Sequence, residues 1–416
     1  MTEAGSPRRF AHSAALDGVR ALAAGMVMLH HVGTVAGTTE RWPVSGAWVR
    51  RMDSGVAIFF VLSGFLLYRP MLSRQLSGKT PVSLAGFWRS RFWRIFPAYW
   101  LALAILWWIE SVAIFGADDF WHVVTLTQIY DPYWILTGIV QTWSLATEMS
   151  FYVVLPLLAL AFARVARGRS VRDQARIVIA LVVLLFAAAW GFHWAVETWA
   201  PELGGHTTWL PWYADTFALG MLLAALAAWA EHDPDVERVV HAVGRRGTAW
   251  VAAAFLSFWV VCTQVGLSNQ AFVAQEFWRE STRHALYGLM GFLVVLPFAL
   301  APGPDVSLAH RAFGWKPVAW LGLVSYGVFL WHQMFLTGYW AEKNLPYRVN
   351  DLQFAGRLAW TAPLSILIAA ASYYLFEKPL HDRFAKKRSP GAGDASRQES
   401  STASPTETVP ADAIVA

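Results

Sequence analysis

A basic side chain and an imidazole share one apolar stretch near the start of the chain, LDGVRALAAGMVMLHHVG. Ten residues separate Arg20 from His31. On a helix, eleven steps of about 100° place both side chains on one face, roughly 16 Å apart, whereas His30 points about 80° away. Charged and titratable residues inside a membrane-length helix are costly and usually face a protein interior or a water-filled path. The alignment therefore predicts a functional site, in which Asp17 is close enough to pair with Arg20.

Three further arginines, Arg89, Arg91 and Arg94, lead into another apolar run in the segment RSRFWRIFPAYW. The guanidinium group is a planar fork that suits bidentate binding of phosphate. At the cytoplasmic edge of a span these side chains would meet the phosphates of a cytoplasmic cofactor. We therefore expect them to capture an anion together with Arg20.

Polar groups also occur deep within two later apolar runs. Ser144, Glu148 and Tyr152 follow at four-residue steps and so share one helix face. Glu148 lies on the order of 16 Å inside the outer edge, where a carboxylate needs a cation, a donor or a proton. His332, counted from the start of its own run, lies at about the height of His31. With the arginines, these groups suit a large anionic cofactor whose reactive end enters the bundle, such as the thioester acyl-CoA.

Each of these groups also has a structural interpretation. Arg20 could be an interfacial anchor, and the three later arginines could set the topology or bind anionic lipid heads. Glu148 could fix helix packing, and His31 and His332 could be hydrogen-bonded packing histidines. The pair Ser63-Gly64 is interpreted as a small-residue site for close helix approach.

The composition places the chain among multispanning membrane proteins. Of its 416 residues, 56% are hydrophobic and only 15% are charged, which is too apolar for a soluble protein. The single cysteine, Cys262, excludes a disulfide framework and a cysteine-based metal site, and no metal is expected. The net charge of +5 is spread in groups between apolar runs rather than in one stripe, so nucleic acid is not an expected partner.

The predicted fold is all-α, with about ten transmembrane helices in a cell membrane and both termini cytoplasmic. This orientation puts about 23 Lys and Arg on the inner side and about 8 on the outer side. No cleavable signal peptide is expected. Residues 1–11 are expected to form a cytoplasmic segment, 12–380 the membrane domain, and 381–416 a disordered polar cytoplasmic tail. The ten expected spans are Leu16–Ala36, Ser54–Tyr68, Ile95–Phe115, Thr137–Ala163, Arg176–Trp194, Trp209–Ala230, Thr248–Gly266, His284–Ala301, Val318–Trp340 and Arg357–Phe376.

In order and spacing these residues resemble the acyltransferase-3 family of integral membrane O-acyltransferases, which modify sugars and other hydroxylated metabolites. The resemblance covers about residues 12–380, and each motif is weak by itself. The Arg-x10-His motif of the family falls on Arg20 and His31, and its Arg-x-x-Arg motif falls on Arg91 and Arg94. The other matches are Phe59, Phe60, Ser63, Gly64 and Phe65 in the second span, Trp143, Glu148 and Tyr152 in the fourth, and Ser325, Tyr326 and His332 in the ninth.

The resemblance implies transfer of an acyl group, often acetyl, from cytoplasmic acyl-CoA to a hydroxyl of an acceptor. The acceptor classes it leaves open are a glycan, a lipid-linked sugar and a secondary metabolite. Some members carry an extracytoplasmic hydrolase-like domain after the membrane part, whereas this sequence has a short polar tail. A stand-alone enzyme, or one that passes the acyl group to a separate extracytoplasmic protein, is expected.

A mechanism follows as a hypothesis. His31 would deprotonate the acceptor hydroxyl or carry the acyl group transiently. Glu148 would orient an imidazole or stabilise its cationic form, Tyr152 would donate to the developing oxyanion, and His332 would handle a second proton. Arg20, Arg91 and Arg94, with Arg89 beside them, would bind CoA. The competing classes are a transporter or flippase that uses the same charges as a proton or lipid path, and a membrane sensor or scaffold without catalysis.

Overall fold

The computed structural model of the chain describes residues 13–109, 112, 114, 116–200, 202–269, 275–301, 303, 306–336 and 351–384. Every regular element in these parts is a helix, which confirms the predicted all-α class. The longer helices are α1 (Ala14–Val35), α3 (Pro43–Arg51), α4 (Gly55–Leu76), α5 (Leu84–Trp108), α6 (Ala117–Val124), α7 (Thr142–Ala166), α8 (Val171–Trp199), α9 (Leu210–Ala230), α10 (Pro234–Gly244), α11 (Gly247–Thr263), α12 (Phe277–Leu300), α14 (Lys316–Leu323), α15 (Ser325–Leu336), α17 (Asp351–Ser372) and α18 (Lys378–Phe384). The short elements are α2 (Thr38–Arg41), η1 (Met52–Ser54), η2 (Gln128–Tyr130), η3 (His206–Thr208), α13 (Leu308–Phe313) and the π-helical segment η4 (Tyr373–Glu377).

Six helical stretches are long and apolar enough to cross a membrane, and the number rises to eight if each of two bent helix pairs forms one span. The bent pairs are α10 with α11, at 59°, and α14 with α15, at 71°. The ten predicted spans are therefore not all confirmed. Helices α1 and α5, whose arginines and histidines lower their hydropathy, are not among the eight. The six stretches are Pro43–Leu76, Thr142–Ala166, Val171–Trp199, His206–Ala230, Phe277–Leu300 and Gln353–Phe384.

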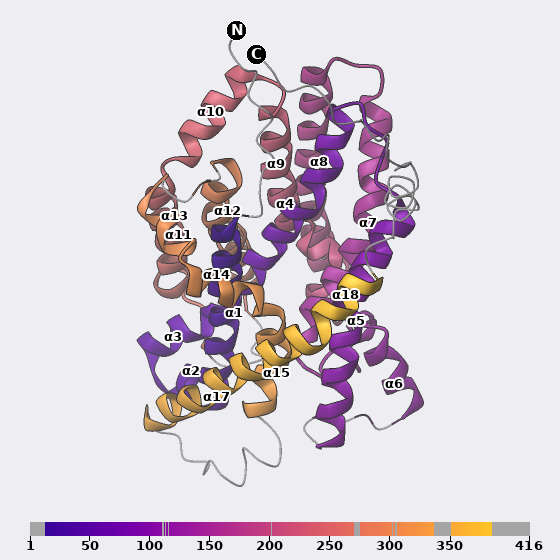
Figure 1. Cartoon of the computed structure of the whole chain (residues 1–416). Coiled ribbons are helices and arrows are strands. Elements are labelled where there is room, and N and C mark those ends of the chain that lie inside the picture. Colours follow the sequence, from indigo (N-terminus) through magenta and orange to yellow (C-terminus); the bar gives the residue numbers. More distant parts are fainter. Residues whose placement is uncertain are drawn as a thin grey trace, which may run out of the picture.

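The helices form a bundle in which α10 lies at one end, while α2, α3 and α6 lie at the other (Figure 1). Helix α17 crosses the bundle obliquely, from the end near α2 and α3 toward α18 and α5 (Figure 1). The expected termini, residues 1–11 and most of the 381–416 tail, lie outside the described residues. The first four residues of that tail, 381–384, belong to α18.

The predicted ninth span, Val318–Trp340, is not one continuous helix. The chain bends at Val324 between α14 and α15, and residues 337–340 lie outside the described part. The hydroxyl of Ser325 donates to the carbonyl of Gly322 at 2.8 Å and so satisfies a group at the end of α14. Both halves of the bent span contact α1. A Cβ atom on Gly322 would collide with the backbone carbonyl of Asp17, so this glycine lets α14 approach α1 closely.

Helices α4 and α9 pack backbone against backbone at the centre of the bundle. A Cβ atom on Gly64 would collide with the carbonyl of Phe217, and one on Gly220 would collide with the carbonyl of Val61. Beside this contact, the rings of Phe60 and Phe217 stack with centroids 4.5 Å apart. The close approach predicted for the Ser63-Gly64 pair is therefore confirmed for Gly64. The contact at Gly64 fixes the position of α4 in the bundle. In this position Ser63, on α4, contacts Glu148 on α7.

The C-terminal segments hold the arginine-bearing turn of α5 in place. The hydroxyl of Tyr326, on α15, donates to the carbonyl of Ile95 at 3.0 Å. Two residues earlier, the ring of Trp93 stacks on that of Phe384 in α18, with centroids 4.5 Å apart. Residues that lie far apart in the sequence thus position Arg94, which stands between these two contacts along α5.

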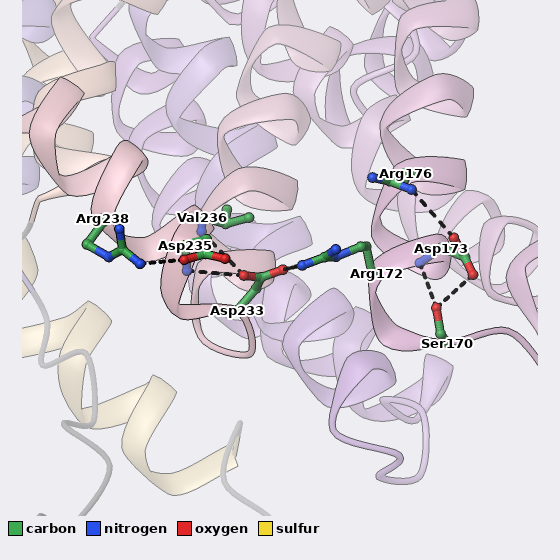
Figure 2. A network of polar contacts seen from close by, with 8 residues as sticks. All are labelled: Ser170, Arg172, Asp173, Arg176, Asp233, Asp235, Val236 and Arg238. Carbon is green, nitrogen blue, oxygen red and sulfur yellow. Dashed lines mark hydrogen bonds and ion pairs between the residues drawn. The ribbon is translucent and has the colours of Figure 1, made fainter.

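A polar network at the surface joins the start of α8 to the start of α10 (Figure 2). Arg172 donates to Oδ2 of Asp233 at 2.9 Å, and Oδ1 of Asp233 accepts from the backbone N–H groups of Asp235 and Val236, which caps α10. On the other side, Ser170 caps α8. The hydrogen bond from Arg172 is the main cause that holds the pKa of Asp233 below its ordinary value.

Candidate active site

Two histidines from distant parts of the chain meet at the centre of the site. The Nδ1 atom of His31, on α1, lies 3.0 Å from Nε2 of His332, on α15. His332 is fully buried, and its Nδ1 lies 3.0 Å from the carbonyl oxygen of Val328. The equal heights predicted for the two histidines are therefore confirmed.

This contact determines which nitrogen of His31 is free. A carbonyl oxygen only accepts, so Nδ1 of His332 carries the proton that it donates to Val328. Nε2 of a neutral His332 then holds a lone pair, which accepts a proton donated by Nδ1 of His31. The remaining nitrogen of His31, Nε2, is left with its lone pair. Because His31 is only half-buried, this lone pair can serve as a base toward a bound hydroxyl.

Arg20 lies on the same helix as His31, three turns earlier. Its guanidinium donates to the carboxylate of Asp17 at 2.6 Å, so the predicted pair is confirmed. Arg20 also interacts electrostatically with Arg94 and Tyr152. The alignment along α1 thus connects the His31 end of the helix to a group of cations at its beginning.

Arg91 and Arg94 complete this group of cations. Arg91 interacts electrostatically with Arg94, Arg20, Glu148 and Tyr152. Within the described residues, neither Arg91 nor Arg94 forms an ion pair. Three guanidinium groups within electrostatic range of one another, two of them without an ion-pair partner, attract an anion with several charges. We call Arg20, Arg91 and Arg94 the arginine group.

Arg89 lies away from the arginine group. It precedes Arg91 by two residues, so it points roughly 160° away around α5. Its side chain is half-buried, and its Nε donates to no described residue. The structure therefore brings together three of the four predicted cofactor-binding arginines and separates the fourth.

Glu148 is satisfied by hydroxyl groups. Its Oε1 atom accepts from the hydroxyl of Tyr152 at 2.6 Å and from the hydroxyl of Ser63 on α4. Among the described residues its hydrogen bonds join it to these two groups and to neither His31 nor His332. Ser144 donates to the carbonyl of Gln141 at 3.0 Å, so it stabilises the start of its own helix. Of the three residues predicted to share one face, Glu148 and Tyr152 therefore bond to each other, whereas Ser144 bonds to the backbone of its own helix. Ser63 is the partner of Glu148 that the sequence did not predict.

A carboxylate near the C-terminal end lies within electrostatic range of Arg94. Glu377 lies in the π-helical segment η4, accepts from the hydroxyl of Ser372 at 2.8 Å, and interacts electrostatically with Arg94. Single π-helical turns often occur at functional sites. The sequence signal for this residue was an acidic side chain directly after a long apolar run.

A second set of buried titratable groups lies in α8, α9 and α12. Nε2 of His284 lies 2.9 and 3.0 Å from the two carboxylate oxygens of Asp215. The side chains of this pair are only 5% and 3% exposed. His193 packs edge-on against His284, with ring centroids 4.6 Å apart, and its Nε2 lies 2.7 Å from the carbonyl of Trp212. An aspartate inside an apolar run was the signal that could have revealed this pair.

In the part of the chain that the structure describes, the fold and the site define a class: a helical, multi-pass membrane protein that combines a histidine pair, His31 with His332, with an arginine group contributed by α1 and α5. Residues 13–377 match the family model for the acyltransferase domain of the acyltransferase-3 family. The chain therefore belongs to this family, as the resemblance of its motifs predicted.

Curated relatives share the same region. The chain is 26% identical over 389 residues to the peptidoglycan O-acetyltransferase OatA of Listeria monocytogenes, covering 88% of this chain and 55% of the relative. It is 23% identical to the putative peptidoglycan O-acetyltransferase YrhL of Bacillus subtilis, covering 88% and 54%, and to the O-acetyltransferase OatA of Staphylococcus aureus, covering 88% and 57%. The chain spans about half the length of these relatives. No solved structure matches the chain significantly.

Proposed function

We propose that this protein moves an acyl group, acetyl in the first instance, from acyl-CoA to a hydroxyl of a carbohydrate acceptor. The observation that carries the proposal is the pairing of His31 with His332, which leaves Nε2 of His31 free as a base on the helix face that also holds Arg20. The relatives are named O-acetyltransferases, two of them with peptidoglycan as the acceptor, which supports acetyl as the group and a glycan as the acceptor.

The donor would lie along α1. Its phosphates would be bound by the arginine group, where bidentate guanidinium contacts are strong. Arg20 and His31 are separated by roughly 16 Å along the helix, a separation that the extended pantetheine arm of CoA can span. The thioester would then reach Nε2 of His31.

The transfer step follows from this placement. Nε2 of His31 takes the proton of the acceptor hydroxyl while that oxygen attacks the thioester carbonyl. The tetrahedral intermediate collapses, the C–S bond breaks, and the thiolate of CoA takes the proton from His31. His332 holds the ring of His31 in the productive tautomer. The alternative, in which His31 carries the acyl group between two half-reactions, uses the same free nitrogen.

Glu148 and Tyr152 would act beside the arginine group rather than beside the histidines. Glu148 orients the hydroxyl of Tyr152 and offsets part of the charge of Arg91. In this arrangement the thioester carbonyl would lie at His31, remote from Tyr152, so the oxyanion role expected for Tyr152 is not part of the proposal; its hydroxyl would instead donate to a phosphate of the donor if it turns away from Glu148. Glu377 would offset the charge of Arg94 in the same way.

The membrane orientation is part of the proposal. We propose that α1 and α5 also cross the bilayer, beside the six apolar stretches and the two bent pairs. Ten spans would put both termini on one side, and the excess of Lys and Arg on that side favours the cytoplasm. Acyl-CoA would then reach the arginine group from the cytoplasm, and the chain would act within the lipid bilayer. A separate extracytoplasmic protein is the proposed partner if the acyl group is passed on before it reaches the glycan.

Transfer of label from acetyl-CoA tests the proposal. Purified protein in lipid nanodiscs is incubated with acetyl-labelled acetyl-CoA and an oligosaccharide, and free CoA and labelled sugar are quantified. We expect both products from the wild type and neither from His31→Ala. His241→Ala, which alters an exposed histidine on α10, is the matched control. Movement of a substrate across the bilayer with an intact thioester would instead identify a transporter.

A further inference from the structure

A second polar network borders His31 at the end of α1 that is remote from the arginine group. His30 packs edge-on against His31, with ring centroids 5.1 Å apart, and its Nδ1 lies 2.9 Å from the carbonyl of Arg50. Asp53 lies in η1, which begins directly after α3, and it interacts electrostatically with His30. The chain thus brings a carboxylate to the side of the histidine pair that faces α3 and η1.

Helix α12 supplies the other members of this network. The hydroxyl of Tyr287 donates to Oδ1 of Asp53 at 2.5 Å, and Arg283 lies 3.5 Å from Oδ2. Arg283 also pairs with Glu280. A carboxylate accepts about four hydrogen bonds, so the contacts with Tyr287 and Arg283 leave acceptor positions on Asp53 open.

The exposure of its side chains distinguishes this network from the Asp215–His284 contact. The side chains of Asp53 and Arg283 are each 29% exposed, and that of Glu280 is 20% exposed. In the Asp215–His284 pair the corresponding values are 3% and 5%. The closed pair has no room for a ligand, whereas the network around Asp53 is accessible. The network reaches His31 through His30, which interacts electrostatically with Asp53 and packs against His31. Accessible charged groups within the span region are expected to be functional.

We infer that Asp53, Arg283 and Tyr287 form the subsite that binds the hydroxyl groups of a carbohydrate acceptor beside His31. This inference rests on the proposed function. The donor occupies the path from the arginine group to His31, so the acceptor has to approach from the opposite end of α1. Sugar hydroxyls both donate and accept, and a carboxylate beside a guanidinium and a phenol offers each of them a complementary partner.

Steady-state kinetics of the full chain in nanodiscs test the subsite, with acetyl-CoA as donor and chitopentaose as the acceptor probe. Loss of a hydrogen bond to a charged group lowers affinity by about 10- to 100-fold. We expect Asp53→Asn to raise KM for chitopentaose by about tenfold or more, with KM for acetyl-CoA changed less than about twofold. Tyr287→Phe removes one hydroxyl without altering the packing, and it should raise the same KM by a smaller factor.

Glu231→Gln is the matched control, because Glu231 pairs with Arg69 at the opposite end of α4 with similar exposure. It should change neither KM. Unchanged KM for chitopentaose in both folded variants, or an equal rise for donor and acceptor, would overturn the subsite. So would a wild type that cleaves acetyl-CoA but never acetylates chitopentaose. A wild type that neither binds nor cleaves acetyl-CoA would instead overturn the proposed function, and the inference with it.

Discussion

Two groups of histidines lie within the bundle, and they differ in whether a ring nitrogen stays accessible. In the first, His31 and His332 contact each other, and Nε2 of the half-buried His31 stays free. In the second, Nε2 of His284 lies against both oxygens of Asp215, and both side chains are closed off. The first arrangement keeps a lone pair accessible, whereas in the second the contact between His284 and Asp215 is closed to solvent.

This difference in accessibility suggests different roles for the two histidine groups, chemical for the first and structural for the second. A buried ion pair stabilises a fold only when its geometry compensates for desolvation, and removal of one partner leaves an uncompensated charge. A histidine with one engaged and one free nitrogen is fixed in orientation and tautomer, as a base requires. We therefore expect substitutions in the first group to reduce turnover and those in the second to reduce stability.

Replacing His31 by Ala should have the largest effect. Loss of a general base slows a reaction by about 10²- to 10⁴-fold, so we expect kcat with acetyl-CoA to fall about 1,000-fold while donor binding persists. Rate and binding are measured on the same preparation by CoA release and by calorimetry. A folded variant that turns over at the wild-type rate would remove His31 from the mechanism.

His332 is the next most sensitive position. Removing a group that orients a reactive imidazole costs about 10- to 100-fold, and His332→Ala should lower kcat to that extent. His332→Gln places an amide oxygen near the former Nε2, where it can accept from His31, so it should recover most of the rate. Equal rates for the two variants would show that the tautomer of His31 does not depend on this contact.

Arg91→Ala should act on donor binding. One lost charge-assisted contact to phosphate raises KM for acetyl-CoA by about 10- to 100-fold, with kcat little changed. Arg89→Ala, which alters the arginine on the opposite side of α5, should raise it by a smaller factor. Initial rates over a range of acetyl-CoA concentrations measure both effects. Equal effects of the two substitutions would contradict the assignment of the arginine group.

Asp215→Asn should leave turnover within about threefold of the wild type but reduce stability. Leaving a buried polar group without its hydrogen-bond partner costs about 1–3 kcal/mol, which should appear as a fall in Tm in detergent. Asp235→Asn, at a surface aspartate whose side chain is 75% exposed, is the control and should leave Tm nearly unchanged. Loss of activity in Asp215→Asn at a temperature where it is fully folded would give the closed pair a chemical role.

The surface link at Asp233 should produce the smallest effect. Its pKa is lowered in the folded state, mainly by Arg172, so its contribution to stability is present above the unfolded pKa and is lost as pH falls through the lower, folded value. We expect Asp233→Ala to have a lower Tm than the wild type at pH 7, and the difference to shrink below about pH 4. A constant difference from pH 7 to pH 3 would exclude this linkage.

The features predictable from the sequence were those set by helical periodicity. The spacing of Arg20 and His31, the pairing of Arg20 with Asp17, and the equal heights of His31 and His332 depend only on rise and rotation per residue. Gly64 was also identifiable, because close helix contacts favour small residues.

Contacts that depend on how helices are packed could not be predicted. Ser63 reaches Glu148 only because Gly64 lets α4 lie against α9. The bend at Val324 has no proline beside it that would have predicted it. His284 and Asp215 are 69 residues apart, so only the folded bundle reveals their pairing. The direction of Arg89, in contrast, followed from periodicity and could have been derived from its position relative to Arg91.

A structure of the protein with a non-hydrolysable acetyl-CoA analogue in nanodiscs is the most direct test of the two ends of α1. We predict phosphates in contact with Arg20, Arg91 and Arg94, and the acetyl carbonyl close to Nε2 of His31. An analogue bound with its phosphates elsewhere, or with its acetyl group remote from His31, would contradict the account.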